Sequence, residues 1–250
     1  MNCRSFLLAA VLSCVCAVAT AAAGEVRVAV ASGLAEPMRL IAASFEKDTG
    51  NKVYSTVDAT SGLYARITRG TAFDVLVPGN SSVLGQLEAR NLLVPGTRYT
   101  YATSPLVLWS PREGYVDDRG DVLVRNEFHR LSVASPSLVY GRPAAQVLDK
   151  LGVADAVAQK LVERRTLAQS QQFVSAGGAD LGFVTLPQVT LKGRLRRGSA
   201  WLVPRALYDP IEQQAAILDP GRDNLAARSF LFYLKGPKAG AILLDHGFFR

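Results

Sequence analysis

The sequence predicts an α/β protein with two lobes, each a mainly parallel sheet flanked by helices. Short apolar runs alternate with segments whose apolar residues recur every three or four positions, as strands and amphipathic helices do. This alternation occurs in two successive series along 250 residues, a length that accommodates two such units. Strands that alternate with helices in this way indicate parallel sheets.

The first series begins at residue 25. Residues 25–31 (EVRVAVA) alternate and then become continuously apolar, which is typical of a strand that enters a core. Residues 34–49 follow the helical period, and Gly50 ends the helix. The other elements predicted in this series are strands at 52–57, 74–77 and 106–109 and helices at 62–68 and 82–90.

The second series repeats this pattern and then returns to lobe one. Its predicted elements are strands at 131–134, 181–184 and 214–218 and helices at 143–151, 155–161, 170–175, 225–234 and 238–246. We assign residues 24–104 and 208–250 to lobe one and residues 105–207 to lobe two. The two crossings between the lobes would form a hinge that closes on a ligand.

Residues 1–23 have the three-part pattern of a secretory signal peptide. Arg4 supplies a positive charge, residues 6–18 are apolar and uncharged, and small residues up to Ala23 suit cleavage there or at Ala21. The apolar run is short for a membrane span. The sequence therefore predicts removal of this segment and a periplasmic location.

All three cysteines, Cys3, Cys14 and Cys16, lie in this segment. The mature protein would have no thiol, which excludes disulfides, cysteine nucleophiles and thiolate metal sites. A lipid anchor on Cys14 or Cys16 is the less favoured alternative, because the residues before Cys14 fit a lipidation motif poorly.

The basic charge favours a small anionic ligand over nucleic acid. The formal net charge is +7, and removing Arg4 leaves +6. Lysines and arginines are scattered, and the one tight cluster, residues 192–197, contains a glycine and is interpreted as a solvated loop. The charge would then guide anions toward the protein.

Catalysis has little support in the sequence. The histidines, His129 and His246, are interpreted as surface or packing residues, and neither G-x-S-x-G nor H-E-x-x-H is present. An enzyme that uses the same cleft is therefore a weaker hypothesis, and we expect neither catalysis nor a cofactor.

Small, hydroxyl or glycine residues recur where predicted strands pass into helices. These turns lie at 31–33, 59–62, 139–141, 166–168 and, as a possible fifth, 185–187. A helix N-terminus exposes main-chain N–H groups and favours an anion by about 0.3–1 kcal/mol. In α/β sheets such turns gather at the carboxyl ends of the strands, where ligands bind. Each turn alone is more typical of an ordinary N-cap than of a binding site, and only their repetition gives an anion-binding cleft equal weight.

Six fragments, in order along the chain, resemble the periplasmic molybdate-binding proteins of ABC transporters, which have the type II solute-binding fold. The resemblance covers nearly the whole mature chain. The matching fragments are VAVAS at 28–32, SGLYARI at 61–67, LVLWS at 106–110, YGRPAA at 140–145, GFV at 182–184 and PIEQ at 210–213.

The resemblance implies that neutral donors hold a tetrahedral oxyanion, molybdate or tungstate, with no other metal. Ser32 would donate its hydroxyl and main-chain N–H, and either Thr60 or Ser61 would provide the second hydroxyl. Tyr140 and Leu167 would each donate a main-chain N–H. The implied partners are the membrane permease subunits of an ABC importer, and the protein is expected to be a monomer.

The sequence departs from the family pattern at Thr185, where some members place a tyrosine whose hydroxyl reaches the anion. Asn80 stands where an acidic residue is expected. Asp58 lies near the second turn, where a solvated or capping role is favoured over accepting the proton of a phosphate. Another oxyanion such as sulfate, or a sensor without molybdate binding, therefore remains the alternative.

Aromatic residues near the C-terminus form a cluster at helical spacing. This spacing is more typical of core packing than of a docking surface. The residues concerned are Phe230, Phe232, Tyr233, Phe248 and Phe249.

Overall fold

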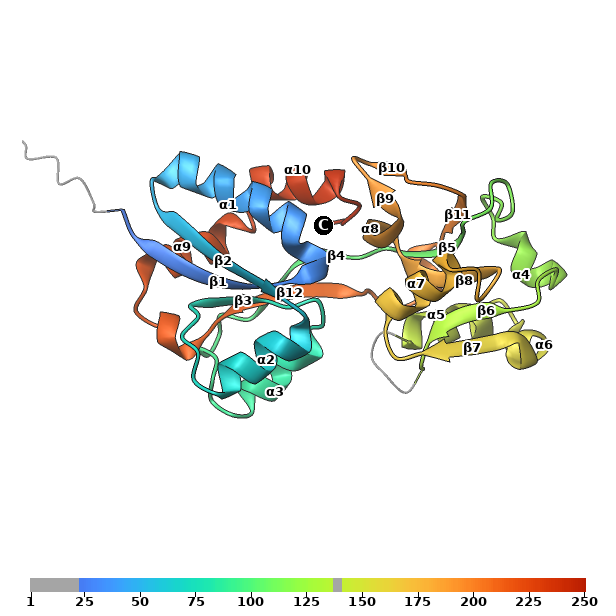
Figure 1. Cartoon of the computed structure of the whole chain (residues 1–250), viewed down its shortest axis with the longest axis horizontal. Coiled ribbons are helices and arrows are strands. Elements are labelled where there is room, and N and C mark those ends of the chain that lie inside the picture. Colours follow the sequence, from blue (N-terminus) through green and yellow to red (C-terminus); the bar gives the residue numbers. More distant parts are fainter. Residues whose placement is uncertain (1–22, 137–140) are drawn as a thin grey trace, which may run out of the picture.

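The computed structural model describes residues 23–136 and 141–250 and shows two lobes, each built around a five-stranded sheet (Figure 1). The predicted signal peptide, apart from Ala23, and Tyr140 lie outside the described residues. No helix within the described ranges is long and apolar enough to cross a membrane.

The sheet of lobe one has the order β2-β1-β3-β12-β4. Its strands are β1 (Glu25–Ala31), β2 (Lys52–Asp58), β3 (Val75–Val77), β4 (Tyr99–Thr103) and β12 (Glu212–Ile217). Only β12 runs against the other four. The register pairs Ala31 with Asp58, so that β1 and β2 end side by side.

The sheet of lobe two has the equivalent order β7-β6-β8-β5-β11. Its strands are β5 (Leu106–Ser110), β6 (Leu131–Ala134), β7 (Leu161–Arg164), β8 (Leu181–Thr185) and β11 (Ser199–Leu202). Only β5 is reversed. The two lobes therefore repeat one topology, in which β6, β7 and β8 correspond to β1, β2 and β3.

Helices cover both faces of the lobe one sheet because its strands are apolar on both sides. Val26, Val28 and Val30 pack with one set of helices, whereas Ala29 packs with the other. The first set is α1 (Ala35–Thr49), α9 (Leu225–Tyr233) and α10 (Pro237–Asp245), and the second is α2 (Thr60–Thr68) and α3 (Ser82–Glu88). Two 3₁₀ turns, η1 (Ser32–Leu34) and η4 (Asp219–Gly221), complete the lobe.

Shorter helices surround the lobe two sheet. They are α4 (Asp121–Arg125), α5 (Arg142–Lys150), α6 (Ala154–Val157), α7 (Leu167–Ser175) and α8 (Leu186–Val189), with 3₁₀ turns η2 (Ala158–Lys160) and η3 (Arg205–Leu207). A small hairpin of β9 (Thr190–Leu191) and β10 (Arg194–Leu195) completes the lobe. Its turn residues, Lys192 and Gly193, both have positive φ, as a tight two-residue hairpin turn requires.

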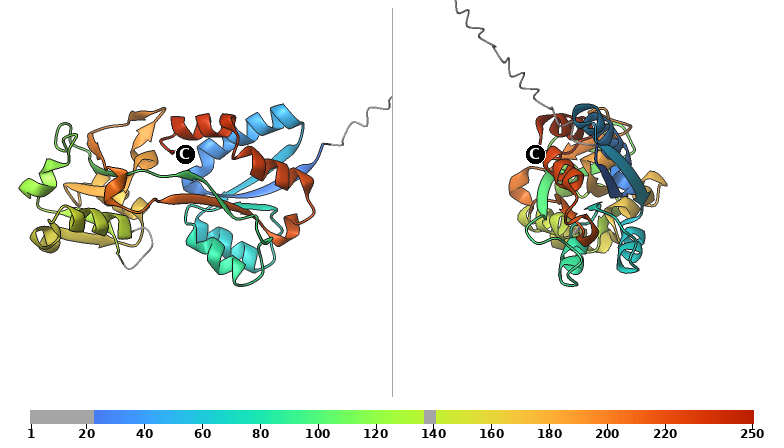
Figure 2. Two further views of the ribbon diagram at one scale, coloured as in Figure 1. Left: turned by 180° about the vertical axis from the view of Figure 1, so that it is seen from behind. Right: turned by 90° about the vertical axis from the view of Figure 1, so that its left-hand side faces the viewer.

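The chain crosses between the lobes from β4 to β5 and returns from β11 to β12, and the two crossings run side by side (Figure 2). The Ser104 N–H donates to the Ile211 carbonyl at 2.8 Å. Gln213 Nε2 donates to Ser104 Oγ at 3.0 Å, and the Leu106 N–H donates to Tyr208 Oη at 2.9 Å. These bonds hold the two crossings together as one connection.

A third contact joins the lobes through the β9–β10 hairpin. The Gly193 N–H donates to the carbonyl of Asp245, at the end of α10, at 2.9 Å. Gly247 lies so close to Thr190 that a Cβ there would be 2.7 Å from Thr190 Oγ1. The hairpin of lobe two therefore rests against the C-terminal turn of lobe one.

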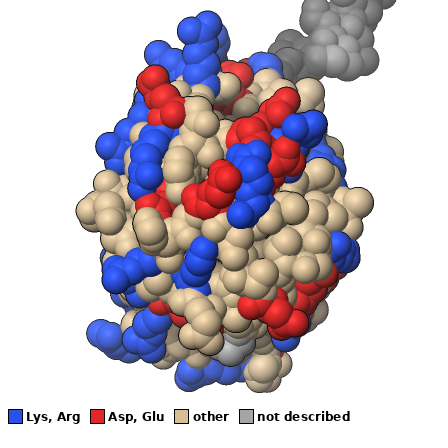
Figure 3. Space-filling model, turned by 90° about the vertical axis from the view of Figure 1, so that its right-hand side faces the viewer, with Lys and Arg blue, Asp and Glu red and all other residues tan. Residues whose placement is uncertain are grey.

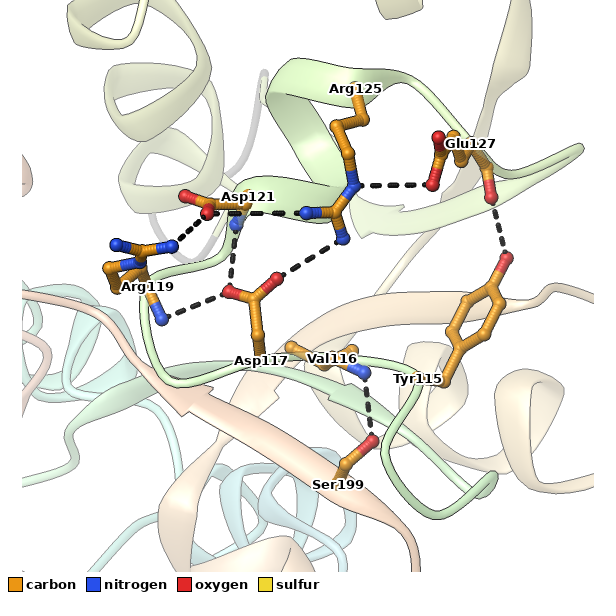
Figure 4. A network of polar contacts seen from close by, with 8 residues as sticks. All are labelled: Tyr115, Val116, Asp117, Arg119, Asp121, Arg125, Glu127 and Ser199. Atoms are coloured by element: carbon orange, nitrogen blue, oxygen red, sulfur yellow. Dashed lines mark hydrogen bonds and ion pairs between the residues drawn. The ribbon is translucent and has the colours of Figure 1, made fainter.

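The segment between β5 and β6 is held at the far end of lobe two by a network of ion pairs (Figure 4). Arg125 contacts Asp117 at 3.3 Å and Glu127 at 3.1 Å, and Arg119 contacts Asp121 at 2.8 Å. Burial raises the pKa of Asp117, but hydrogen bonds from the Asp121 and Arg119 N–H groups and from Arg125 bring this pKa below its ordinary value. Figure 3 shows acidic and basic side chains interspersed on this end face, so that neither charge dominates it.

The strands predicted from the sequence are confirmed within two residues at each end. The helix predicted over 155–161 is confirmed as α6 followed by the 3₁₀ turn η2, and it is wrong only at Leu161, which begins β7. The short edge strand β7 is stabilised by its pairing with β6. The local periodicity of the sequence does not reveal this pairing. The elements β4, β11 and α4 were not predicted from the sequence.

The prediction of core packing is confirmed for Phe230, Phe248 and Tyr233 of the aromatic cluster, but not for Phe232 or for the half-buried Phe249. Phe230 and Phe248 are buried, whereas Phe232 is 75% exposed. Phe45 of α1 packs edge to face against Phe230 and Tyr233, with ring centroids 5.3 and 5.4 Å apart. This contact ties α1 to α9.

We predict that Phe45→Ala lowers the free energy of unfolding by about 3–5 kcal/mol, because it leaves a cavity in this core. Urea denaturation followed by circular dichroism measures the loss. Phe232→Ala on α9 is the control and should leave stability within about 0.5 kcal/mol, since its ring is exposed. Equal losses in the two variants would contradict the assigned core.

Candidate functional site

The carboxyl ends of the parallel strands in the two lobes are directed toward each other (Figure 1). Strands β1, β2 and β3 run toward lobe two, and β6, β7 and β8 run toward lobe one. The helix that follows each of these strands therefore begins on the side that faces the other lobe. In open α/β sheets this edge is where ligands bind.

Ser32 lies at the first of these helix starts. It begins η1 directly after β1, and its side chain is exposed. Nothing lies within 4 Å of the position that a Cβ would take on Gly33, so this turn has room beside it. The N–H groups of a first helical turn have no partner within the helix, so the Ser32 turn can present them to a ligand.

Thr60 and Ser61 are the first two residues of α2. Thr60 Oγ1 accepts a hydrogen bond from the Gly79 N–H at 3.1 Å, and this bond uses an oxygen lone pair rather than the hydroxyl proton. A Cβ on Gly79 would lie 3.4 Å from both Ala31 Cβ and Thr60 Oγ1. The structure thus brings together the turns that follow β1, β2 and β3.

A carboxylate lies against the same helix start. Asp58 ends β2, and its Oδ1 accepts a hydrogen bond from the Ala59 N–H at 2.7 Å. A Cβ on Gly62 would lie 2.5 Å from Asp58 Oδ2 and 2.7 Å from Asp58 Cγ. A side chain at position 62 would therefore require the Asp58 carboxylate to move, because the carboxylate occupies that place.

Leu167 is the first residue of α7 and corresponds in topology to Thr60. The N-cap Thr166 accepts a hydrogen bond from the Gln169 N–H at 3.1 Å, which satisfies the third N–H of the helix. The cap does not bind the N–H groups of Leu167 and Ala168, which lie at the end of α7 that faces lobe one. The Leu167 side chain is buried in the lobe two core, so only its main chain can serve a ligand.

The turn after β6 is closed tightly by Gly141, the N-cap of α5. A Cβ on Gly141 would lie 1.9 Å from the Ser135 carbonyl oxygen, so only glycine fits. The Ser135 N–H donates to the Arg164 carbonyl at 2.8 Å, which joins this turn to the end of β7. Tyr140, which the sequence assigns to the same helix start, lies outside the described residues.

Thr185 ends β8 and is the N-cap of α8, so the fifth predicted helix start is confirmed. Its N–H and its hydroxyl both donate to Gln188 Oε1, at 2.8 and 2.9 Å. The hydroxyl would have to leave Gln188 to reach an anion. Asn80 has a comparable local role, because its Oδ1 accepts from the Ser82 N–H at 2.8 Å at the start of α3.

The two histidines and the basic cluster belong to none of these turns. His129 is exposed, and His246 Nδ1 is 2.7 Å from the Ile242 carbonyl oxygen within the α10 region. The basic cluster 192–197 belongs mostly to the exposed β9–β10 hairpin, so its interpretation as a solvated loop is confirmed.

The match to known proteins covers nearly the whole described chain. Residues 26–249 match the model of the bacterial extracellular solute-binding protein family. Over 229 residues the chain is 48% identical to the molybdate-binding protein ModA of Azotobacter vinelandii, an alignment that covers 91% of each chain. The chain belongs to the ModA family of bacterial extracellular solute-binding proteins.

Further comparisons agree with this membership. ModA of Rhodobacter capsulatus is 38% identical over 229 residues, which cover 91% of this chain and 89% of the relative. The solved structure of the Azotobacter vinelandii periplasmic molybdate-binding protein superposes with a TM-score of 0.74 and 32% identity. That superposition covers 90% of this ModA-family chain and 99% of the solved one, so both lobes are shared.

We predict that Gly62→Ala fails to give the gain of up to about 1 kcal/mol that a helical Gly→Ala replacement ordinarily brings, because its Cβ meets the Asp58 carboxylate. In an Asp58→Ala background the same replacement should stabilise the protein. A double-mutant cycle by urea denaturation should show a coupling free energy of about 1–2 kcal/mol. Strictly additive effects would show that the two residues do not share this space.

Proposed function

We propose that this protein captures molybdate or tungstate between its two lobes and delivers the anion to an ABC importer. Membership of the ModA family supports the ligand class. The observation that carries the proposal is that both lobes begin their helices at facing strand ends. Helix N-termini from two sides provide many N–H donors for a single anion.

We assign the donors on the described helix starts. Ser32 contributes from the first, Thr60 or Ser61 from the second, and the Leu167 N–H from lobe two, with Tyr140 added by resemblance to the family. A hydrogen bond to a charged group contributes about 1.5–3 kcal/mol. Several such bonds inside a closed cleft would hold a dianion with neutral donors alone.

The chemistry of these donors selects a fully deprotonated tetrahedral anion. N–H and hydroxyl groups donate to every ligand oxygen, and the assigned donor set contains no carboxylate acceptor for a ligand proton. Sulfate has the same charge and shape as molybdate but is smaller. The distance between the donors after the lobes close therefore decides between them, and sulfate is the alternative ligand.

We place the mature protein in the periplasm as a monomer, after removal of residues 1–23. Lobe one comprises residues 24–104 and 208–250, and lobe two comprises residues 105–207. The paired crossings between them serve as the hinge, and the permease subunits of the importer receive the closed form. The proposed role is binding and transfer without catalysis.

We predict that molybdate and tungstate stabilise the purified mature protein in a concentration-dependent way. At a ligand concentration 100 times Kd, the stabilisation is about 2.7 kcal/mol. Thermal unfolding and calorimetry against molybdate, tungstate, sulfate and phosphate provide the measurement. Absence of any shift at millimolar molybdate, or equal affinity for sulfate, would overturn the assigned ligand.

We predict that Leu167→Pro weakens molybdate binding by at least about tenfold relative to Leu167→Ala, because only proline removes the N–H donor. Leu167 is the first residue of α7, a position that accepts proline, and Thr166 has the extended φ of −144° and ψ of 158° that suit a residue before proline. Both variants lose the same buried leucine, so the alanine variant is the matched control. Calorimetry gives the two Kd values, and equal values would exclude this N–H from the site.

A further inference from the structure

We propose that Asp58 limits the affinity of the anion site, and that it penalises a ligand in proportion to the ligand's negative charge. This inference rests on the proposed function, because it concerns the helix start assigned to Thr60 and Ser61. None of the donors in that assignment is charged, so a carboxylate beside them changes the electrostatics of the site more than any of them.

The position of the carboxylate is defined by its contacts with the chain. Oδ1 is tied to the Ala59 N–H at 2.7 Å, and the group lies over Gly62 in the first turn of α2. Gly62 has no positive φ, so its backbone conformation does not demand glycine, and a Cβ there would meet the Asp58 carboxylate. The pair therefore holds a negative charge against the end of α2 that carries the positive pole of its dipole.

Asp58 makes no ion pair within residues 23–136 and 141–250. In the same lobe, Glu36 pairs with Arg39 and Asp48 pairs with Lys238, whereas Asp58 has no such partner among the described residues. An anion that approaches Thr60 and Ser61 therefore meets the field of Asp58 together with that of the helix start.

Coulomb's law gives the size and the form of the effect. A unit charge about 6 Å from a dianion changes its binding constant by about tenfold in a water-like dielectric. For a monoanion in the same place the energy is halved, so the change is about threefold. Asp58 therefore weakens the binding of a dianion more than that of a monoanion. The site would prefer dianions over monoanions more strongly if Asp58 were neutral.

The test compares the wild type with Asp58→Asn by calorimetry at low ionic strength, with molybdate as the dianion and perrhenate, added as a competitor, as a tetrahedral monoanion. We expect molybdate binding about tenfold tighter and perrhenate binding about threefold tighter in the variant. The gain should shrink in 0.5 M salt, because exposed charges are screened. Asp58→Ala is a second neutral variant, and thermal unfolding of both checks the fold.

Two controls separate charge from other effects. Asp223→Asn removes an exposed carboxylate next to Asn224, which contacts the start of β1, at the opposite end of the sheet, and should leave both affinities unchanged. Asp58→Glu keeps the charge and should bind molybdate as weakly as the wild type does.

Three other results of the binding experiment would overturn the inference. If both neutral variants bind molybdate within twofold of the wild type, or more weakly, Asp58 serves only α2 and the inference is overturned while the proposed function stands. If the gain is equal for molybdate and perrhenate, the effect is not Coulombic and the inference is likewise overturned. If neither wild type nor variants bind molybdate, the proposed function falls and this inference falls with it.

Discussion

The N–H groups at the first turn of a helix have no partner within that helix, and this constraint organises the molecule. In each lobe a helix follows each of three parallel strands, and the lobes turn these helix starts toward each other. Some starts are satisfied locally, as Thr166 does for Gln169 and Gln188 does for Thr185. The N–H groups at Ser32, at Thr60 and at Leu167, the last in the same helix start as Gln169, are the ones that we propose donate to the anion.

The equivalent topology of the two lobes explains how one chain surrounds a ligand from both sides. Each sheet contains one reversed strand, β12 or β5, and each of these strands directly follows a crossing between the lobes. The crossings are tied at Ser104 and Tyr208, and the β9–β10 hairpin adds a contact at Asp245. In the closure that we propose, the lobes would rotate about these paired crossings, and the helix starts would stay in opposition.

The structure adds two local interactions to the sequence-based account of the site. Thr185 stands where some family members place a ligand-binding hydroxyl, and both of its donors bind Gln188. Asp58 was interpreted as a solvated or capping residue, and it does bond the next N–H, but it also fills the space over Gly62. Each interaction joins a residue to another three or four positions later, at the start of a helix. The spacing of residue types in the sequence does not show which way these side chains turn.

The sequence by itself determined the fold class, the strands such as 25–31 and 181–184, and the places where helices begin, because apolar period and turn chemistry are local properties. It missed β4, β7 and β11, since these short strands are stabilised by pairing with neighbours distant in the chain. Only the tertiary structure decided that the turns at Ala31, Thr60 and Gly79 are in contact. The physical reason is that the order and direction of strands in a sheet follow from the packing of the whole lobe, which local sequence does not contain.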